Sequence, residues 1–183
     1  LLVATIVALL PASQIAAAAQ DEEEGRTALL VALPVRRGSL LASRLTMTAG
    51  VVALTAALAG MASWLGASTQ GVDAGFGSML VAGLNVAPTA LVVLGTGAFV
   101  LAVLPRAAAP AMYTIVIGSL VIDLLASLVD GTRWLDTFSL FHYMALAPAH
   151  GVDATAVIVD LVLAAVLAST AIVIFARRDI VTR

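Results

Sequence analysis

The sequence contains no cysteine and no lysine, and each absence excludes a class of chemistry. Without cysteine there are no disulfides, no thiolate metal sites and no cysteine nucleophiles. Without lysine the phosphate-binding loop Gly-x-x-x-x-Gly-Lys cannot be assembled, so any ATP hydrolysis must belong to another protein. Charged residues make up only 11% of the chain, and the net charge is −2. This balance argues against a protein that binds nucleic acid.

The sequence patterns of metal sites and hydrolases are also missing. The two histidines, His142 and His150, match no His-Glu-x-x-His or similar ligand spacing. No Gly-x-Ser-x-Gly nucleophile elbow occurs either. We therefore expect a chain that is not an enzyme and that holds no metal or cofactor of its own.

Apolar side chains are what the sequence has in abundance. Hydrophobic residues make up 62% of the 183 residues, and the mean hydropathy is +1.11. Soluble domains are about 45–50% apolar and about 25% charged, and one soluble core of this size cannot bury the excess. A membrane-spanning helix needs about 20 mostly apolar residues, and five stretches qualify: 1–19, 39–66, 76–104, 111–130 and 154–176.

These stretches predict an all-α fold, a polytopic transmembrane helical bundle of about five spans that forms a single domain over residues 1–183. The third stretch is longer than a membrane needs, and Gly83, Asn85 and Pro88 interrupt it. We expect a short interfacial helix there, followed by a span that begins near Pro88.

The arginines set the orientation of the spans. If residues 1–19 cross from outside to inside, the cytoplasmic segments are 20–38, 105–110 and 177–183. Counting Arg44 at the membrane edge, eight of the nine arginines then lie inside and only Arg133 lies outside, as the positive-inside rule requires. Reading residues 1–19 as a cleaved signal peptide would invert every loop, so a span is favoured.

The origin and the limits of the chain can be anticipated in the same way. Arginine without lysine, together with abundant Ala, Val and Leu, is typical of a GC-rich bacterial genome, so we expect a multi-pass protein of the bacterial cytoplasmic (inner) membrane with a cytoplasmic C-terminus. The first residue is Leu1, inside an apolar run. We expect the natural protein to have a further N-terminal portion that contains another span.

Segment 20–38 has the most distinctive charge pattern. Four acids, residues 21–24, precede a short helix candidate, where the positive end of the helix dipole favours them. Leu29, Leu30 and Leu33 share one face of that helix, and Pro34 ends it. By charge pattern alone this is an ordinary surface helix with solvated acids and with arginines at lipid head groups.

Ionisable residues inside a span are candidates for function because their burial in lipid is costly. Asp123 and Asp160 are both expected about 10 Å below the outer surface, at 1.5 Å per residue. Together with Asn85 they are candidates for the translocation path, and the two acids would line one acidic outer cavity. The alternative is that they are hydrogen-bonded groups in helix packing.

Three motifs resemble those of one transporter family. The first runs from Glu22 to Arg26 (Glu-Glu-x-Gly-Arg) and continues as Leu29-Leu30-x-x-x-Pro34-Val35-x-Arg37. The others are Phe138-Ser-Leu-Phe-His-Tyr143 and Phe175-Ala-Arg-Arg-Asp-Ile180. In this order among the spans, they resemble the type-2 ABC-exporter permeases, and most closely a C-terminal fragment of an actinobacterial drug or polyketide exporter permease. Leu140 stands where that family has Pro, and Val35 lacks the following Ser.

The resemblance implies a function and a set of partners. The chain would be the permease subunit of an ATP-driven exporter that moves hydrophobic or amphipathic cargo outward, as in multidrug efflux. Its partners would be cytoplasmic ABC ATPase subunits, which hold ATP and Mg²⁺, and a second permease half or copy. A coupling helix would dock on the ATPase through Glu22, Glu23, Glu24, Gly25, Arg26, Leu29, Leu30 and Pro34.

The resemblance also implies that residues 131–152 form an outer re-entrant segment that closes the exit. Phe138, Phe141 and His142 would belong to this outer gate. Two other interpretations stay open. One is an ion- or proton-coupled secondary transporter that uses Asp123 and Asp160, and the other is a structural membrane protein without transport.

Overall fold

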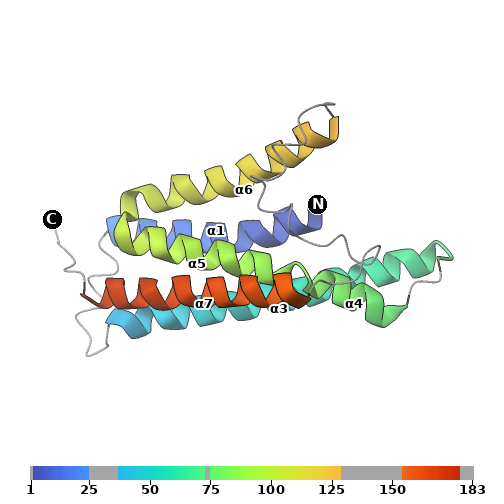
Figure 1. Cartoon of the computed structure of the whole chain (residues 1–183), viewed down its shortest axis with the longest axis horizontal. Helices are drawn as coiled ribbons and strands as arrows, with labels where there is room; N and C mark the ends of the chain where they lie inside the picture. The colour runs from blue at the N-terminus through green and yellow to red at the C-terminus, as the bar shows by residue number, and fades with distance from the viewer. Residues whose placement is uncertain (1, 25–36, 73–74, 129–153, 178–183) are drawn as a thin grey trace.

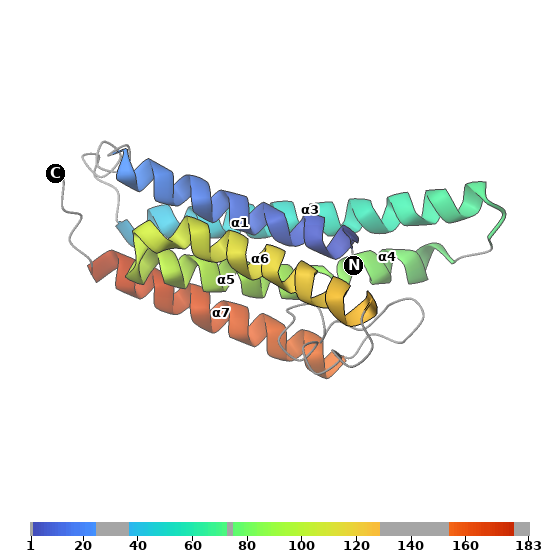
Figure 2. The ribbon, with the colours of Figure 1, turned by 90° about the horizontal axis from the view of Figure 1, so that it is seen from above.

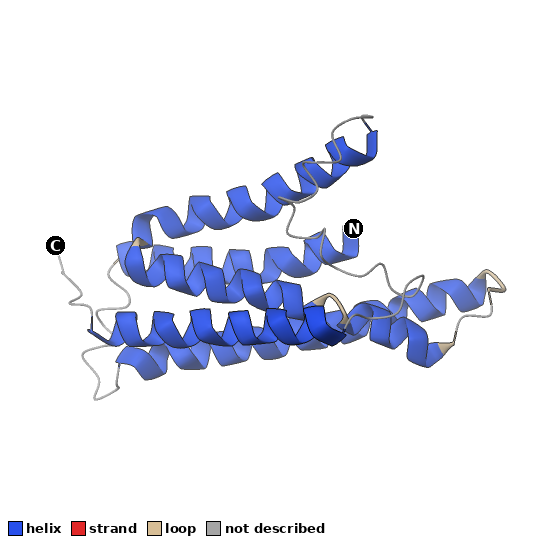
Figure 3. Cartoon of the chain, viewed as in Figure 1, coloured by secondary structure: helices blue, strands red, loops and turns tan. Residues whose placement is uncertain are grey.

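The computed structural model describes residues 2–24, 37–72, 75–128 and 154–177, and these residues contain helices joined by short turns and no strand (Figure 3). The fold class is therefore confirmed as all-helical. The helices are α1 (Leu2–Glu23), α3 (Arg37–Thr69), α4 (Phe76–Leu84), α5 (Ala87–Val103), α6 (Pro105–Leu128) and α7 (Ala154–Arg177).

The lengths of the helices suit a membrane. Within the described ranges, four helical stretches are long and apolar enough to cross one: Gly38–Thr69, Phe76–Val103, Pro105–Ile122 and Ala154–Arg177. With its 22 residues, α1 is about 33 Å long at 1.5 Å per residue, against about 30 Å of hydrocarbon. Helices satisfy their own backbone hydrogen bonds, which lipid cannot do. The chain is a multi-pass helical membrane protein.

Helix α5 is the centre of the bundle. It packs most extensively on α7 and also contacts α1, α6 and α3, so most of its residues are buried (Figures 1 and 2). Helix α6 packs on α1 and α5 and diverges from the other helices toward its C-terminal end (Figure 1). The outward side of α7 exposes Ile158, Val162, Val166 and Val173, side chains that suit lipid.

Glycines let neighbouring helices approach closely at two contacts. A Cβ atom at Gly95 of α5 would lie 2.9 Å from the carbonyl oxygen of Ala164 on α7. A Cβ atom at Gly83 of α4 would lie 2.6 Å from the carbonyl oxygen of Ala56 on α3. Membrane helices associate largely through such backbone approach at small residues, because lipid provides no hydrophobic drive between helices. These glycines therefore seat α7 on α5 and α4 on α3.

The interruption expected in the third stretch is present. Helix α4 ends at Leu84 with Asn85 as its C-cap, and α5 starts at Ala87. Pro88 lies in the first turn of α5, where its missing N–H removes no intrahelical hydrogen bond.

Two helices extend beyond the predicted spans. Residues 105–110 belong to α6, so this helix begins before the span predicted from residue 111. Pro105 is tolerated as the first helical residue, and Pro110 comes only two turns in, so it disturbs a single hydrogen bond near the helix end. Helix α1 also continues past Ala19 to Glu23.

Candidate functional site

One end of the bundle brings together segments that are far apart in the sequence. The C-terminal end of α1, the N-terminal end of α3 and the C-terminal end of α7 meet there, and we call it the Arg44 end (Figure 2). A Cβ atom at Gly38 would lie 3.3 Å from that of Ala176, which places the start of α3 against the end of α7. A pocket at this end is lined by Ala18, Glu22, Leu40, Leu41, Arg44, Leu101 and Phe175.

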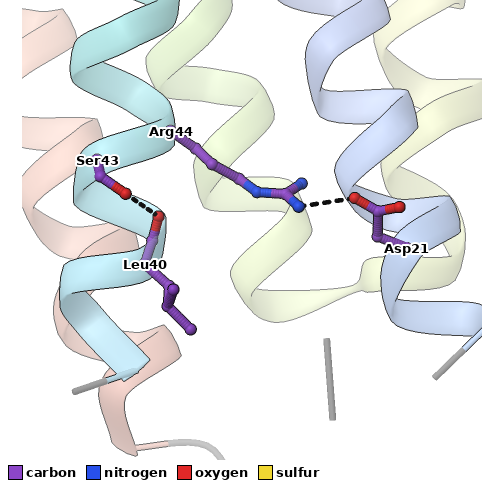
Figure 4. Close-up of polar contacts among 4 residues, drawn as sticks. All are labelled: Asp21, Leu40, Ser43 and Arg44. Carbon is purple, nitrogen blue, oxygen red and sulfur yellow. Dashed lines mark hydrogen bonds and ion pairs between the residues drawn. The ribbon is translucent and has the colours of Figure 1, made fainter. Parts of the chain in front are cut away.

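An ion pair crosses the Arg44 end. Arg44 of α3 donates from Nη2 to Oδ2 of Asp21 on α1 at 2.7 Å (Figure 4). The Arg44 side chain is 44% exposed and the Asp21 side chain 26% exposed. Solvent screens such a pair, which contributes about 0–1 kcal/mol. Its consequence is geometric, because it joins the two helices on either side of residues 25–36.

The acidic cluster lies at a different place from the one the sequence suggested. The last turn of α1 contains Asp21, Glu22 and Glu23. These acids therefore lie at the C-terminal end of one helix as well as ahead of the short helix candidate. The negative end of the α1 dipole disfavours them there, and no basic residue of α1 itself offsets it. Arg44 from α3 supplies the compensating charge to Asp21. Gln20 also donates to Oε1 of Glu24 at 2.9 Å, which supports the end of the helix.

The described arginines gather at the Arg44 end. Arg37 and Arg44 lie near the start of α3, and Arg177 ends α7. Arg106 lies in the first turn of α6, which directly follows α5. The end of α5 is at the Arg44 end, because Leu101 of α5 lines the pocket there. In the part of the chain that the structure describes, the opposite half of the bundle carries no arginine. This asymmetry is the pattern of the positive-inside rule.

A polar pair lies on the other side of the bundle, within the spans. Thr89 in the first turn of α5 donates its hydroxyl to Oδ2 of Asp160 on α7 at 3.0 Å. Thr89 is buried and Asp160 is half-buried. A carboxylate in a span costs about 2.5–3.5 kcal/mol on insertion scales. The first turn of α5 also places the positive end of a helix dipole near the negative side chain.

The other predicted path residues are Asn85 and Asp123. Asn85 lies in the break between α4 and α5, one turn before Thr89. Asp123 lies in α6, and nothing is described of its side chain. Because α6 packs mainly on α1 and α5 while α7 packs mainly on α5 and α3, direct packing of α6 on α7 does not form the expected shared cavity. That cavity stays a prediction.

Much of the predicted coupling and gate set lies outside the described residues. Glu22 and Glu24 are placed at the end of α1, and Glu23 is placed by its backbone. The predicted coupling and gate residues that lie outside the described ranges are Gly25, Arg26, Leu29, Leu30, Pro34, Phe138, Phe141 and His142.

Two partners were missed by the sequence reasoning. Thr89 gave no signal beyond being a hydroxyl residue just after Pro88 in an apolar span. The sequence shows Asp21 only as part of an acidic cluster and Arg44 only as a charge at the membrane edge. The available clue was that an acid and a base lie at the facing ends of two consecutive spans, because such ends are close together when the connection is short.

The fold and these polar groups define a class, the polytopic helical membrane proteins with ionisable groups inside their spans. Over residues 1–176 the sequence matches the family model described as the multidrug efflux system permease Rv1217c, C-terminal domain. The chain belongs to this family. Comparison with curated proteins gives no match. Membership confirms the exporter-permease resemblance and indicates a membrane transport protein of multidrug efflux rather than an enzyme.

Proposed function

We propose that the chain is the transmembrane permease subunit of an ATP-driven ABC exporter in the bacterial cytoplasmic membrane. It moves hydrophobic or amphipathic cargo outward. A separate cytoplasmic ATPase binds ATP and Mg²⁺, and a second permease half or copy completes the path. The family name supports efflux. The use of ATP as the energy source and the partner subunits are the further parts of this proposal.

The gathering of arginines at one end of the bundle carries this proposal. By the positive-inside rule the Arg44 end faces the cytoplasm, and the C-terminal end of α7 lies there with it. In the sequence, residues 25–36 follow α1 and precede α3, and the end of α1 and the start of α3 both lie at this end (Figure 2). In this proposal the segment that resembles a coupling helix is on the side where a cytoplasmic ATPase docks.

The contacts at the Arg44 end support transmission of force. The Asp21–Arg44 pair ties the end of α1 to the start of α3, so a push on residues 25–36 reaches both helices together. Helices α1 and α3 both contact α5, which is the centre of the bundle. In this proposal Leu29 and Leu30 fill an apolar cleft on the ATPase. The residues that pair with charges around that cleft are Glu22, Glu23, Glu24 and Arg26.

Changing both leucines to aspartate tests the docking. In Leu29→Asp/Leu30→Asp, two charges enter the apolar contact, where an unpaired buried charge costs several kcal/mol. We expect copurification of the ATPase to be lost and substrate-stimulated ATP turnover in nanodiscs to fall to background. Replacing Glu22, Glu23 and Glu24 by Ala should have a smaller effect that weakens with salt, because exposed ion pairs contribute about 0–1 kcal/mol each.

A matched control places the same two charges at the other end of α3. Ser68→Asp/Thr69→Asp alters two exposed residues there and should leave both measurements normal. Normal ATPase recovery in the double-leucine variant would remove the coupling assignment. Asp160 in a span favours the alternative of an ion-coupled transporter. That alternative would gain if an imposed ion gradient drove efflux without the ATPase.

A further inference from the structure

The Asp160 carboxylate has an unbalanced charge within the described structure. Its one described polar contact is the neutral hydroxyl of Thr89. Arg177 lies on the same helix, 17 residues or about 25 Å away. Across residues 2–24, 37–72, 75–128 and 154–177, no basic side chain pairs with Asp160. A carboxylate inside a span that is matched only by a hydroxyl favours a cation from outside the bundle.

The surroundings of Asp160 combine a packed side and an open apolar side. Thr89 is buried beside the apolar cluster of Val7, Val52, Ala56, Ala87 and Ala90, contributed by α1, α3 and α5. On α7, the neighbours Ile158, Val159, Leu161 and Val162 are 42–60% exposed. The half-buried carboxylate therefore lies where the bundle interior meets an exposed apolar helix face. A ligand could place a charge on Asp160 and its apolar body along α7.

The number of ligating groups selects the kind of cation. Among the described residues there is no group of three or more His, Cys, Asp or Glu side chains that could hold a metal ion. Divalent ions need several oxygen ligands, whereas one carboxylate and one hydroxyl suffice for a single organic cation in an apolar setting.

We propose that Asp160, positioned by Thr89, recognises the positive charge of cationic amphipathic cargo. The inference rests on the proposed export function, because it names the cargo class of that function. Asp160 contacts the cargo in this scheme, and Thr89 is a positioning residue. The Thr89 hydroxyl holds the carboxylate against α5, so the free carboxylate oxygen is presented at a fixed place.

Binding of a matched pair of hydrophobic ions tests the proposal. Tetraphenylphosphonium and tetraphenylborate have nearly the same size and shape and opposite charge. The full-length permease in nanodiscs, without nucleotide and without ATPase, is titrated with each. We expect Asp160→Asn to weaken tetraphenylphosphonium binding by at least about tenfold. Tetraphenylborate binding should stay equal or become tighter, and Asp160→Glu should keep cation affinity within about threefold of wild type.

A pair of hydroxyl variants provides the control. Thr89→Val should weaken cation binding by about two- to fivefold, in line with the modest net contribution of one typical hydrogen bond that only positions the carboxylate. Thr170→Val removes a hydroxyl whose hydrogen bond, in the described part of the chain, stays within α7, to the Val166 carbonyl oxygen; this variant should leave binding of both probes unchanged. Equal cation affinity in wild type and Asp160→Asn, or equal loss of both probes, would overturn the proposal. Because no ATP is present, that failure leaves the ATP-driven function untouched, and failed ATPase docking leaves this measurement untouched.

Discussion

The contact between Arg44 and Asp21 joins the two helices that border residues 25–36. It is too exposed to add much to stability. Its position, however, allows one side chain to set the spacing between the end of α1 and the start of α3. It also offsets part of the unfavourable charge at the end of α1, which carries three acids in its last turn.

Reversing these charges one at a time should impair coupling more than stability. Arg44→Asp places a third negative charge beside Asp21 and Glu22, so we expect α1 and α3 to separate at this end. Stability should fall by no more than about 1 kcal/mol, while substrate-stimulated ATP turnover should fall several-fold at low salt. The exchange Asp21→Arg/Arg44→Asp restores the attraction and should recover most of the turnover.

The control for this prediction is Arg177→Asp, the same charge change at the same end of the bundle; among residues 2–24, 37–72, 75–128 and 154–177, Arg177 has no ion-pair partner. It should leave turnover close to wild type. A double exchange that fails to restore turnover would show that the two side chains do not act through each other.

At the scale of elements, the α3–α4 hairpin depends on contact between backbones. Gly83 of α4 approaches Ala56 and Gly60 of α3 so closely that a methyl group would come within 2.6 Å of backbone atoms. Gly77, on the same helix, has nothing within 4 Å of the corresponding position. One short helix thus contains a crowded glycine and an open one.

The substitutions Gly83→Ala and Gly77→Ala should therefore change stability in opposite directions. Both gain about 1 kcal/mol in helix propensity. At Gly83, however, the methyl group would force α4 away from α3, and overpacking costs about 1–3 kcal/mol. We expect thermal denaturation in detergent to show a lower Tm for Gly83→Ala and an equal or higher Tm for Gly77→Ala. Equal shifts in the two variants would argue against the close contact.

For the whole molecule, the orientation in the membrane can be measured directly. Because the chain has no cysteine, single cysteines at Arg36, Thr69 and Thr182 can be labelled without background. We expect a membrane-impermeant thiol reagent to label position 69 from outside in intact cells. Positions 36 and 182 should react only after the membrane is opened. Labelling of position 36 from outside would reverse the proposed topology.

The sequence alone determined that this chain is a helical membrane protein. The sequence contains long apolar runs with few charges. In lipid, the backbone N–H and C=O groups of such a run must form hydrogen bonds within the protein, and a helix forms them within the run itself. The break near Asn85 followed from local residue types as well. The family resemblance came from three local motifs and was confirmed. The first residue of a helix did not follow from the predicted span, as α6 shows, because a proline near a helix start is compatible with either a loop or a first turn.

Only the tertiary structure decided which polar residues meet. Thr89 and Asp160 are 71 residues apart, and Arg44 and Asp21 are 23 apart. Helix periodicity specifies which side chains share a face, and it does not specify which helices become neighbours. That choice depends on how closely backbones approach, as Gly95 and Ala164 do where α5 meets α7. Helices α6 and α7 both contact α5, and their other main contacts are with α1 and α3 respectively, an arrangement that the spacing of Asp123 and Asp160 along the sequence does not specify.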